Sequence, residues 1–417
     1  MPDSWAWARL ASILSLSSGK SIKVRQLADV GEYPVYGGNG INGTYSDCNV
    51  DTETIVIGRV GYYCGSVYKT ISKAWVTDNA LIATIKEPHV FETDLLVEIL
   101  RYLDLGKTSV STAQPVVSGK GILPLIIPIP PQAQQKNILE SYNSIIPIVD
   151  TIEKNREDLL AVITNIKAKI LDLAIRGKLV PQDPNDEPAS VLLERIRAEK
   201  EELIKQGKIK RDKKESIIFK GDDNSYYEKI GNKLENIDNI IPFEIPDTWQ
   251  WCRGYSCFTG MESEKPSGEF FDYIDIDAID NHLHRIKKTK RMLVSNAPSR
   301  ASRAVKTGSV LFSLVRPYLE NIALVDEKYA NSIVSTGFYV CNSSGALYPE
   351  YMFCLMISGY VVNGLNQFMK GDNSPSISKD NIENWLYPIP PLNEQKMICH
   401  KMKRLFSEIE ATEKSLS

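Results

Sequence analysis

The chain repeats itself, and this repeat constrains its fold more than any other feature. The segment Pro2-Asp3-Ser4-Trp5-Ala6-Trp7 near the start returns as Pro246-Asp247-Thr248-Trp249-Gln250-Trp251. Each copy then continues to the same kind of boundary, Pro128-Ile129-Pro130-Pro131 in the first and Pro388-Ile389-Pro390-Pro391 in the second. An internal duplication of this size predicts two similar domains related by a pseudo-twofold axis.

Length and composition are those of an ordinary globular protein. The 417 residues are 43% hydrophobic and 24% charged, with a net charge of −3, which favours two or three domains with cores of their own. No run approaches the ~18 apolar residues of a membrane span, and the first residues lack a signal-peptide pattern. The seven cysteines include no Cys-x-x-Cys pair, so we expect reduced thiols in a cytoplasmic protein and no metal site.

Short strands and glycine turns dominate each copy. In the first, β-branched runs such as Thr54-Ile55-Val56-Ile57 alternate with turns such as Gly37-Gly38-Asn39-Gly40, and a helical pattern covers residues 94–103. This predicts a mixed α/β (α+β) domain in which strands prevail. The glycine-rich loop lacks the strand-loop-helix context of a nucleotide site, so a tight turn is the default and close approach to DNA the alternative.

A long helix is expected between the copies, because apolar side chains from Gln134 to Arg176 recur in alternating steps of four and three, as in a coiled-coil seam. An unbroken helix here would span roughly 60 Å. Pro147 predicts a kink or short break, and Gly177 predicts the end of the helix. The seam residues are Ile138, Ile145, Val149, Ile152, Leu159, Ile163, Ile166 and Ile170, with Arg156 as a charged break.

Three further segments complete the organisation. A charged helix is predicted over Ser190–Gln206 with Ser190 as its cap, and residues 208–239 are predicted to be a linker or partly ordered loop. The helix after the second copy repeats the seam at Ile398, Met402, Leu405 and Ile409. This last helix is much shorter than the first, which leaves part of the first seam without a partner inside the chain.

Charge is segregated along the sequence. Basic residues recur without any acid between Asn281 and Leu319, and the same holds for residues 54–77 and 105–139. One such run is usually a solvated face. Basic runs in both copies favour a surface that binds a polyanion.

The ordered set of motifs resembles one family, the specificity (S, HsdS) subunits of type I restriction-modification systems. The matching elements are the two Trp-x-Trp openings and the two Pro-Pro boundaries followed by Gln134-Gln135-Lys136 or Glu394-Gln395-Lys396. To these the sequence adds Arg176-Gly177-Lys178-Leu179-Val180-Pro181-Gln182 and Ile241-Pro242-Phe243-Glu244-Ile245-Pro246. Together they cover essentially the whole chain.

The resemblance implies two target-recognition domains joined by antiparallel coiled-coil spacer helices. The implied segments are 1–131 (first recognition domain), 132–206 (central spacer helices), 207–241 (linker), 242–391 (second recognition domain) and 392–417 (short distal spacer helix). Each domain would read one half of a bipartite, asymmetric site in double-stranded DNA. The helices would dock modification (methyltransferase) subunits and, through the complex, restriction (endonuclease) subunits. The short distal helix departs from the family pattern, so we expect either a truncation or a seam completed by another subunit.

Two other functions stay open at this stage. The chain contains no Asp/Asn-Pro-Pro-Tyr/Phe element, no cofactor loop and no Ser/His/Asp order, so we expect a non-catalytic subunit without a cofactor. It could instead be the recognition fragment of a single-chain DNA methyltransferase or restriction enzyme, which methyl transfer by the isolated chain would favour. A helical scaffold that binds proteins would form complexes without DNA.

Candidate DNA contacts follow from the basic runs. Arginine presents a planar fork that fits guanine O6 and N7 or a phosphate, and hydroxyls suit phosphate contacts. The alternative for each is an ordinary surface ion pair or, for the tyrosines, half-buried packing. The candidates are Arg59, Tyr62, Lys69, Lys107 and Ser109 in the first copy, and Ser299, Arg300, Arg303, Arg316, Tyr318, Asn321, Lys370 and Asn373 in the second.

The four repeat tryptophans and the two neighbouring histidines are expected to have no direct part in binding. Trp5, Trp7, Trp249 and Trp251 are predicted to pack in the cores or between domain and helix. His282 and His284 lack further ligands at metal-binding spacing.

Overall fold

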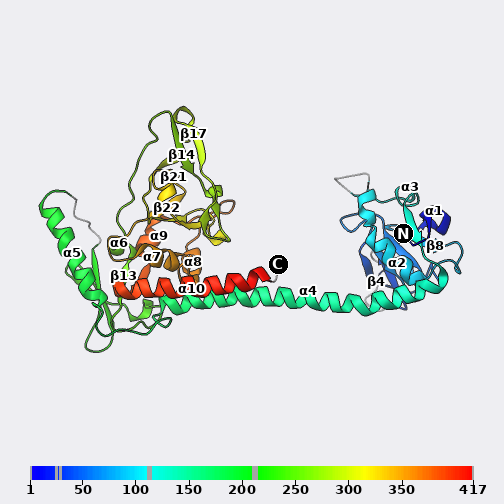
Figure 1. Ribbon diagram of the computed structural model, residues 1–417, viewed down its shortest axis with the longest axis horizontal. Helices are drawn as coiled ribbons and strands as arrows, with labels where there is room; N and C mark the ends of the chain where they lie inside the picture. The colour runs from blue at the N-terminus through cyan, green and yellow to red at the C-terminus, as the bar shows by residue number, and fades with distance from the viewer. Residues whose placement is uncertain (1, 24–26, 28–30, 110–114, 209–214, 416–417) are drawn as a thin grey trace. The chain divides into compact units, whose positions relative to one another are not determined.

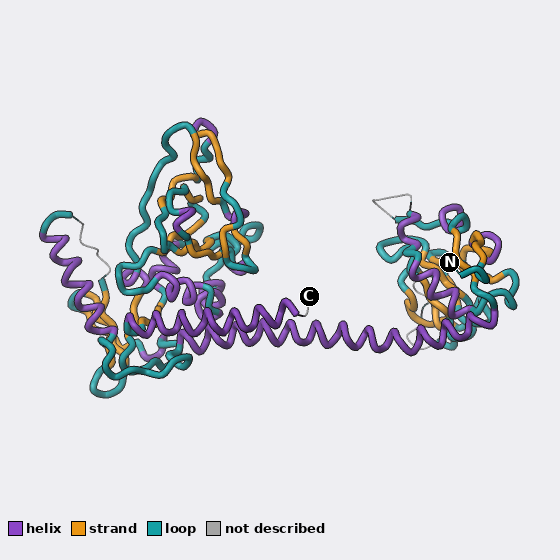
Figure 2. Tube along the Cα trace, in the orientation of Figure 1, coloured by secondary structure: helices purple, strands orange, loops and turns teal. Residues whose placement is uncertain are grey.

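The computed structural model describes residues 2–23, 27, 31–109, 115–208 and 215–415, and Figure 1 draws the chain. The chain divides into two compact units, Met1–Asn155 and Arg156–Ser417. Both units mix helix and sheet (Figure 2), so the expected α/β (α+β) class is confirmed. None of the helices in the described ranges has both the length and the apolar character needed to cross a membrane.

The first unit holds one domain and the start of a long helix. A four-stranded antiparallel sheet in the order β2-β8-β5-β6 shares its core with α2, and a smaller sheet has the order β4-β3-β7. The elements are β1 (Ala6–Arg9), α1 (Leu10–Ile13), β2 (Leu14–Ser18), β3 (Tyr33–Gly37), β4 (Gly40–Tyr45), β5 (Ile55–Gly58), β6 (Val67–Lys69), β7 (Trp75–Val76), β8 (Ala80–Ile85), α2 (Thr93–Tyr102), η2 (Leu105–Thr108), α3 (Gly119–Ile122), β9 (Ile126–Ile129) and α4 (Gln132–Ile175).

The second unit holds the end of α4 and the second domain. Its two main sheets have the orders β20-β19-β22 and β17-β14-β21-β18. The elements are α5 (Ala189–Lys205), β10 (Ser216–Lys220), β11 (Tyr226–Ile230), β12 (Lys233–Asn236), η3 (Asp238–Ile240), β13 (Gln250–Arg253), α6 (Gly254–Cys257), β14 (Phe270–Ile274), η4 (Ile276–Ala278), β15 (Ile279–Asp280), β16 (Arg285–Ile286), β17 (Lys290–Leu293), η5 (Val294–Asn296), β18 (Ala301–Ala304), β19 (Val310–Ser313), η6 (Pro317–Leu319), β20 (Ile322–Leu324), η7 (Glu327–Tyr329), β21 (Ile333–Ser335), β22 (Phe338–Cys341), α7 (Pro349–Met356), α8 (Gly359–Asn366), α9 (Lys379–Asn384), β23 (Leu386–Ile389) and α10 (Leu392–Ser415).

Strand register shows that the sequence duplication extends to the fold. A two-stranded antiparallel ribbon, β1-β9, pairs Trp7 with Pro128, and the ribbon β13-β23 pairs Trp251 with Pro388. β5 lies between β8 and β6 just as β19 lies between β22 and β20. β3 pairs parallel with β7, and β14 pairs parallel with β21. The two domains therefore share one strand plan.

The second domain adds an insertion to this plan. In the first domain, the hairpin between β3 and β4 closes with Gly38 and Asn39 alone. In the second, β14 and β17 are separated by residues 275–289, which form η4 and the small β15-β16 hairpin. β18, which pairs with β21, extends what is only an isolated antiparallel bridge between Val50 and Ala74 in the first domain. Part of the basic run between Asn281 and Leu319 lies on these additions.

The first tryptophan of each pair ties its domain to the following helix. The Trp5 indole nitrogen donates a hydrogen bond to Gln134 Oε1 at 2.9 Å. The Trp249 indole nitrogen donates to Glu394 Oε2 at 2.8 Å. Both tryptophans thus have the structural role predicted from the sequence. Trp7 does not follow the prediction of packing, because 62% of its surface is exposed.

The glutamine after each Pro-Pro boundary repeats this junction. The Gln135 side-chain amide donates to the Pro130 carbonyl at 3.0 Å, and its oxygen accepts from the Glu92 backbone. The Gln395 amide donates to the Pro390 carbonyl at 3.0 Å, and its oxygen accepts from a backbone amide of the second domain. Both glutamines are buried. The glutamine of this motif therefore positions the helix on its domain, since buried polar groups need such partners.

The C-terminal part of α4 packs antiparallel to α10 in the second unit. Ile163 and Ile170 are buried, as are Ile398 and Met402, while Leu405 and Ile409 are partly buried against the same core. Lys167 Nζ pairs with Glu413 Oε2 at 2.8 Å. Ile138 packs against the core of the first domain. The other predicted seam residues are exposed: Ile145, Val149, Ile152, Leu159 and Ile166.

Sequence reasoning was wrong about three details of the spacer region. α4 continues through Pro147, so the alternative of a short break is wrong and the alternative of a kink stays a prediction; Pro147 lies on an exposed face, where water can bond to the carbonyl that loses its donor. α5 begins at Ala189 with Pro188 as its cap, not at Ser190, because the Ala189 amide donates to the Thr248 carbonyl at 2.9 Å. Residues 216–236 form the antiparallel meander β10-β11-β12 instead of a linker.

The end of α4 follows the expectation from Gly177. Gly177 has a φ of +67°, and the Lys178 amide donates to the Leu173 carbonyl at 2.9 Å, as in a left-handed helix stop. A Cβ atom at Gly177 would lie 2.4 Å from Pro246 Cγ. Only glycine therefore fits this turn, which packs against the start of the second domain.

Candidate nucleic-acid interface

Each domain carries a loop at the same place in its strand plan. Loop 59–66 joins β5 to β6, and loop 314–321 joins β19 to β20. Each loop is held by a short segment just before the last helix of its domain, 115–117 in the first and 375–377 in the second. These two assemblies contain or adjoin most of the residues that the sequence nominated.

Each loop forms the same two backbone hydrogen bonds with the segment that holds it, 115–117 or 375–377. In the first domain, the Gly61 amide donates to the Pro115 carbonyl at 3.0 Å, and the Val117 amide donates to the Arg59 carbonyl at 2.9 Å. In the second, the Arg316 amide donates to the Pro375 carbonyl at 2.7 Å. The Ile377 amide likewise donates to the Leu314 carbonyl at 2.9 Å. The backbone frames therefore correspond residue by residue.

The correspondence includes two left-handed positions in each loop. In loop 59–66 these are Gly61 and Gly65, with φ of +93° and +89°. In loop 314–321 they are Arg316 and Glu320, with φ of +49° and +54°. A non-glycine residue in this conformation costs about 1 kcal/mol. The second loop thus retains an arginine where its counterpart accepts glycine, a local strain of the kind that binding sites keep.

Aromatic side chains project from both loops. Tyr63 and Tyr318 occupy corresponding positions and are 49% and 46% exposed, and Tyr62 is 90% exposed. The rings of Tyr62 and Tyr63 meet edge to face, with centroids 5.1 Å apart. A groove beside this loop is lined by the two tyrosines together with Arg101 and Asp104. Exposed aromatic rings beside cations suit stacking on bases or on the sugar-phosphate surface.

The second domain gathers the predicted basic residues near loop 314–321. Arg316 is exposed, and its Nη2 donates to the Asn373 carbonyl at 3.0 Å. Lys370 is exposed beside it and exchanges two backbone hydrogen bonds with Ser376. Tyr318 completes this exposed group. Positions 316 and 373, which are 57 residues apart in the sequence, are therefore brought to one surface.

The other arginine pair adjoins the same loop through the backbone. The Thr336 amide donates to the Arg300 carbonyl at 2.9 Å, and the Leu314 amide donates to the Gly337 carbonyl at 2.8 Å. Ser299 and Arg300 are exposed, and Arg303 is half-buried on β18. Arg303 Nε is buried and has no hydrogen-bond partner among the described residues. Asn321 is only 8% exposed, so it belongs to the loop frame and is not presented at the surface.

The first domain assembles fewer of its nominated residues. Arg59 Nη1 donates to Ser18 Oγ at 3.3 Å, which holds the side chain beside the sheet. The Ser109 hydroxyl accepts a hydrogen bond from the Val116 amide at 3.0 Å. It thus fixes segment 115–117, which holds loop 59–66. Lys107 is exposed and pairs with Asp104 at 3.2 Å.

Lys69 is already neutralised within the first domain. Its Nζ lies 3.1 Å from Glu53 and 2.5 Å from Asp94. The hydrogen bond that Lys69 donates to Asp94 raises the pKa of Lys69; burial opposes this shift, and the hydrogen bond to Glu53 adds to it. The stretch 54–77 lacks an acid in the sequence, but the fold supplies two carboxylates from outside it. Lys69 is therefore a poor phosphate ligand.

The insertion of the second domain buttresses loop 314–321. Asn281 Nδ2 donates to the Leu319 carbonyl at 2.8 Å, and His284 Nε2 lies 3.8 Å from Glu320 Oε2. Burial lowers the pKa of His284, which favours the neutral imidazole here. Among the described residues, no three His, Cys, Asp or Glu side chains come together as a metal site. His282 and His284 thus flank the loop as structural neighbours.

The sequence also placed Tyr63 with Arg59, Tyr62 and Lys69 on one candidate surface, but it did not predict that segments 115–117 and 375–377 hold the two loops, or that Asn281 supports loop 314–321. One signal could have revealed it. Pro115-Val116-Val117-Ser118 and Pro375-Ser376-Ile377-Ser378 share a Pro-x-β-branched-Ser pattern at matching distances from the Pro-Pro boundaries. Within the loops themselves only Val60/Val315 and Tyr63/Tyr318 are identical, which is too little to align them without the backbone.

The chain is similar to proteins of one kind. The family model described as type I restriction modification DNA specificity domain matches residues 2–161 and 264–416. The specificity subunit of the type I restriction enzyme EcoAI from Escherichia coli is 27% identical over 67% of this chain and 53% of its own length. The EcoEI specificity subunit from Escherichia coli is 23% identical over 78% of this chain and 59% of its own length. The chain thus spans a little over half the length of these curated relatives.

Two solved structures found by comparison with this chain are described as S subunits. The HsdS subunit from Thermoanaerobacter tengcongensis is 34% identical over 42% of this chain and 46% of its own, with a TM-score of 0.39. An S subunit of a type I restriction-modification system from M. genitalium is 13% identical over 99% of this chain and 92% of its own, with a TM-score of 0.38.

Proposed function

The chain belongs to the type I restriction-modification DNA specificity family, and from this premise we propose that it reads a bipartite DNA sequence for such a complex. Each domain would contact one half of an asymmetric site through loop 59–66 or loop 314–321. The observation that carries the proposal is the common backbone frame of these loops, filled with different side chains. A shared frame suits one docking geometry on DNA, and different side chains suit unlike half-sites.

The chemistry of the second loop fits direct reading of bases. Arg316 presents its guanidinium from an exposed turn that is fixed at both ends by backbone hydrogen bonds. An arginine held in this way can place its fork against guanine O6 and N7 in the major groove. Arg300, Lys370 and Ser299 then suit phosphate oxygens along the strand. Binding should weaken steeply with salt, because lysine and arginine contacts release counterions.

In this proposal catalysis belongs to other subunits. The chain would contribute recognition and would need no cofactor of its own, whereas modification subunits would transfer the methyl group and restriction subunits would cleave. The exposed seam residues of α4, among them Ile145, Ile152 and Leu159, offer apolar surface for helices of such partners. The domain limits 1–131 and 242–391 stay part of the proposal. So does a cytoplasmic location.

Selection of bound duplexes from a random pool tests this function, with the chain co-expressed with its modification subunit. We expect a split motif with two unlike halves at a fixed spacing. A flat pool from an intact complex at low salt would reject sequence reading and favour a protein scaffold. Methyl transfer by the isolated chain would favour a single-chain modification enzyme.

A further inference from the structure

The two tryptophan ribbons have the same construction but opposite exposure. Trp7 is 62% exposed on β1, while its counterpart Trp251 is 1% exposed on β13. The same contrast holds across the ribbon, where Ile126 is 52% exposed and its counterpart Leu386 is 5% exposed. Strand register makes these pairs equivalent, because each tryptophan faces the first proline of the Pro-Ile-Pro-Pro boundary.

The arginine two residues after the tryptophan extends the comparison. Arg9 Nη1 approaches the Pro124 carbonyl at 3.5 Å, and Arg253 Nη1 donates to the Asn384 carbonyl at 2.7 Å. Arg253 in addition forms a two-pronged ion pair with Glu228, at 3.0 Å and 2.7 Å. Arg9 is exposed and forms no ion pair with any described residue.

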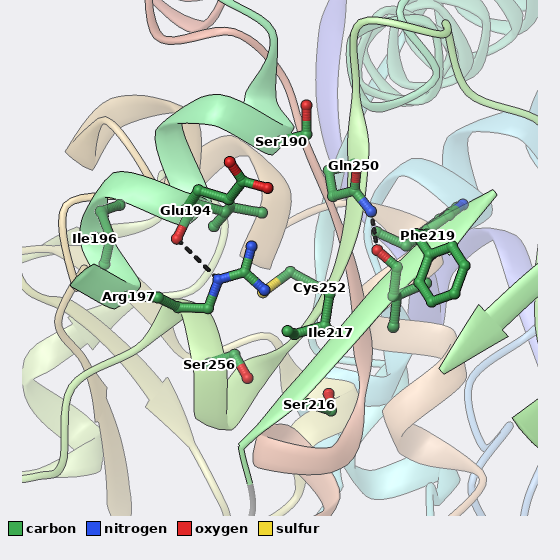
Figure 3. Close-up of a pocket in the computed structure, with 13 residues that line it drawn as sticks. Ser190, Glu194, Ile196, Arg197, Ser216, Ile217, Phe219, Gln250, Cys252 and Ser256 are labelled. Carbon is green, nitrogen blue, oxygen red and sulfur yellow. Dashed lines mark hydrogen bonds between the residues drawn. The ribbon is translucent and has the colours of Figure 1, made fainter. Parts of the chain in front are cut away.

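Part of the cover of the second ribbon comes from the preceding stretch of chain, besides the Tyr360 ring, whose centroid lies 6.3 Å from that of Trp251. The β10-β11-β12 meander supplies Glu228, and Gln250 donates to the Ile218 carbonyl on β10. The Phe243 ring meets the Trp251 ring edge to face, with centroids 5.0 Å apart. Figure 3 shows Ile217 and Phe219 of β10 lying beside the ribbon residues Gln250 and Cys252.

We propose that the Trp7 ribbon of the first domain is a docking surface for a strand-bearing protein segment that presents an aromatic ring and a carboxylate. We call the surface formed by Trp7, Arg9, Ile126 and Pro128 the open ribbon. The ring would cover Trp7 as Phe243 covers Trp251, and the carboxylate would pair with Arg9 as Glu228 pairs with Arg253. Charge complementarity and the covered counterpart identify this occupant. An exposed tryptophan next to an unpaired arginine and an aliphatic residue is also the composition of interface centres.

A segment of the chain itself can serve as the probe in a test. Because Pro2-Asp3-Ser4-Trp5 aligns with Pro246-Asp247-Thr248-Trp249, residues 215–245 can be placed directly before Pro2. This fusion reproduces the chain order that covers the second ribbon. Hydrogen exchange, read by mass spectrometry on peptides that contain residues 6–9 and 126–129, then reports on the open ribbon in the full chain.

We expect the fusion to slow exchange in these peptides by about tenfold or more. A matched fusion that carries Glu228→Ala and Phe243→Ala only in the added copy should lose most of this protection. Arg9→Glu should also remove it, and Glu228→Arg in the added copy should restore it, which identifies the ion pair.

Two results would overturn the proposal. Equal exchange in the fused and unfused chains would mean that the open ribbon does not accept such a segment. Protection in the unfused chain that rises with protein concentration, and is lost in Trp7→Ser, would mean that a second copy of the chain covers it. Trp251 peptides serve as the internal reference, since their ribbon is covered in every variant.

Discussion

The two domains hold loops of one backbone design, but they stabilise and fill them differently. Loop 59–66 places glycines at its left-handed positions and tyrosines at its tip. Loop 314–321 places Arg316 and Glu320 at the same positions and is buttressed by an insertion that the first domain lacks. The comparison shows that the two copies share the backbone conformation of this loop. The side chains and their supports differ, as the proposed reading of two unlike half-sites requires.

The largest expected difference between the domains is the effect on stability of substitutions in their tryptophan ribbons. Glu228→Ala should destabilise the second domain by ~3 kcal/mol, because Arg253, which is 18% exposed, would lose its only carboxylate among the described residues. Arg9→Ala should change the stability of the first domain by less than ~0.5 kcal/mol, because Arg9 is exposed and unpaired there. Hydrogen exchange at denaturant concentrations below unfolding measures both. Equal effects would mean that the ribbons do not differ in their cover.

The same ion pair gives a pH dependence with a defined sign. Burial alone would raise the pKa of Glu228, but the hydrogen bonds and charge of Arg253 outweigh it and hold the pKa below its usual range. Since the folded pKa is depressed, this stabilisation is present above the unfolded value of about 4.3 and is lost as pH falls through the folded value. Glu228→Gln should flatten the acid limb of the stability curve for the second domain only.

The next largest difference is expected in DNA affinity. Arg316→Ala should weaken binding by ~1–3 kcal/mol at one half-site and relax the base preference there. Lys69→Ala is the matched control, because its charge is already engaged by Glu53 and Asp94. Competition binding with duplexes altered in one half-site at a time gives the measurement. Equal losses at both half-sites would reduce Arg316 to a general anchor.

Exchanging the left-handed residues separates strain from binding. Arg316→Gly should stabilise the second domain by ~0.5–1 kcal/mol while it weakens DNA binding as Arg316→Ala does. Gly61→Arg should destabilise the first domain by ~1 kcal/mol from backbone strain alone, because nothing lies within 4 Å of a Cβ at that position. Thermal unfolding followed by domain-specific exchange tests both changes. A stability loss in Arg316→Gly would show that Arg316 is held there for structural reasons.

The smallest effect is expected at the helix junctions. Burial raises the pKa of Glu394, although hydrogen bonds from Trp249 and Gln182 oppose it. A raised folded pKa means that stability is lost as pH rises through that value, so Glu394→Gln should add up to ~1 kcal/mol near neutral pH. The first domain already has glutamine at this place, Gln134. Gln134→Glu should therefore lower the stability of the first domain near neutral pH. Chemical unfolding at pH 5 and pH 8 compares the two variants.

Much of the architecture followed from the sequence alone. The repeated tryptophan and proline motifs set the two domains, and the apolar period between Gln134 and Arg176 predicted α4 and its end at Gly177. These signals are local or strictly periodic, so neighbouring residues are enough to read them. The family and its α/β plan followed from the same motifs.

Tertiary structure alone decided which residues meet. It brought Arg316 to Asn373, paired Lys69 with two carboxylates from outside its run, and buried Asn321. It also folded residues 216–236 into a sheet that covers Trp251 and leaves Trp7 open. None of this is written in local patterns, because contacts, burial and charge pairing depend on residues far apart in the chain that only the packed core brings together.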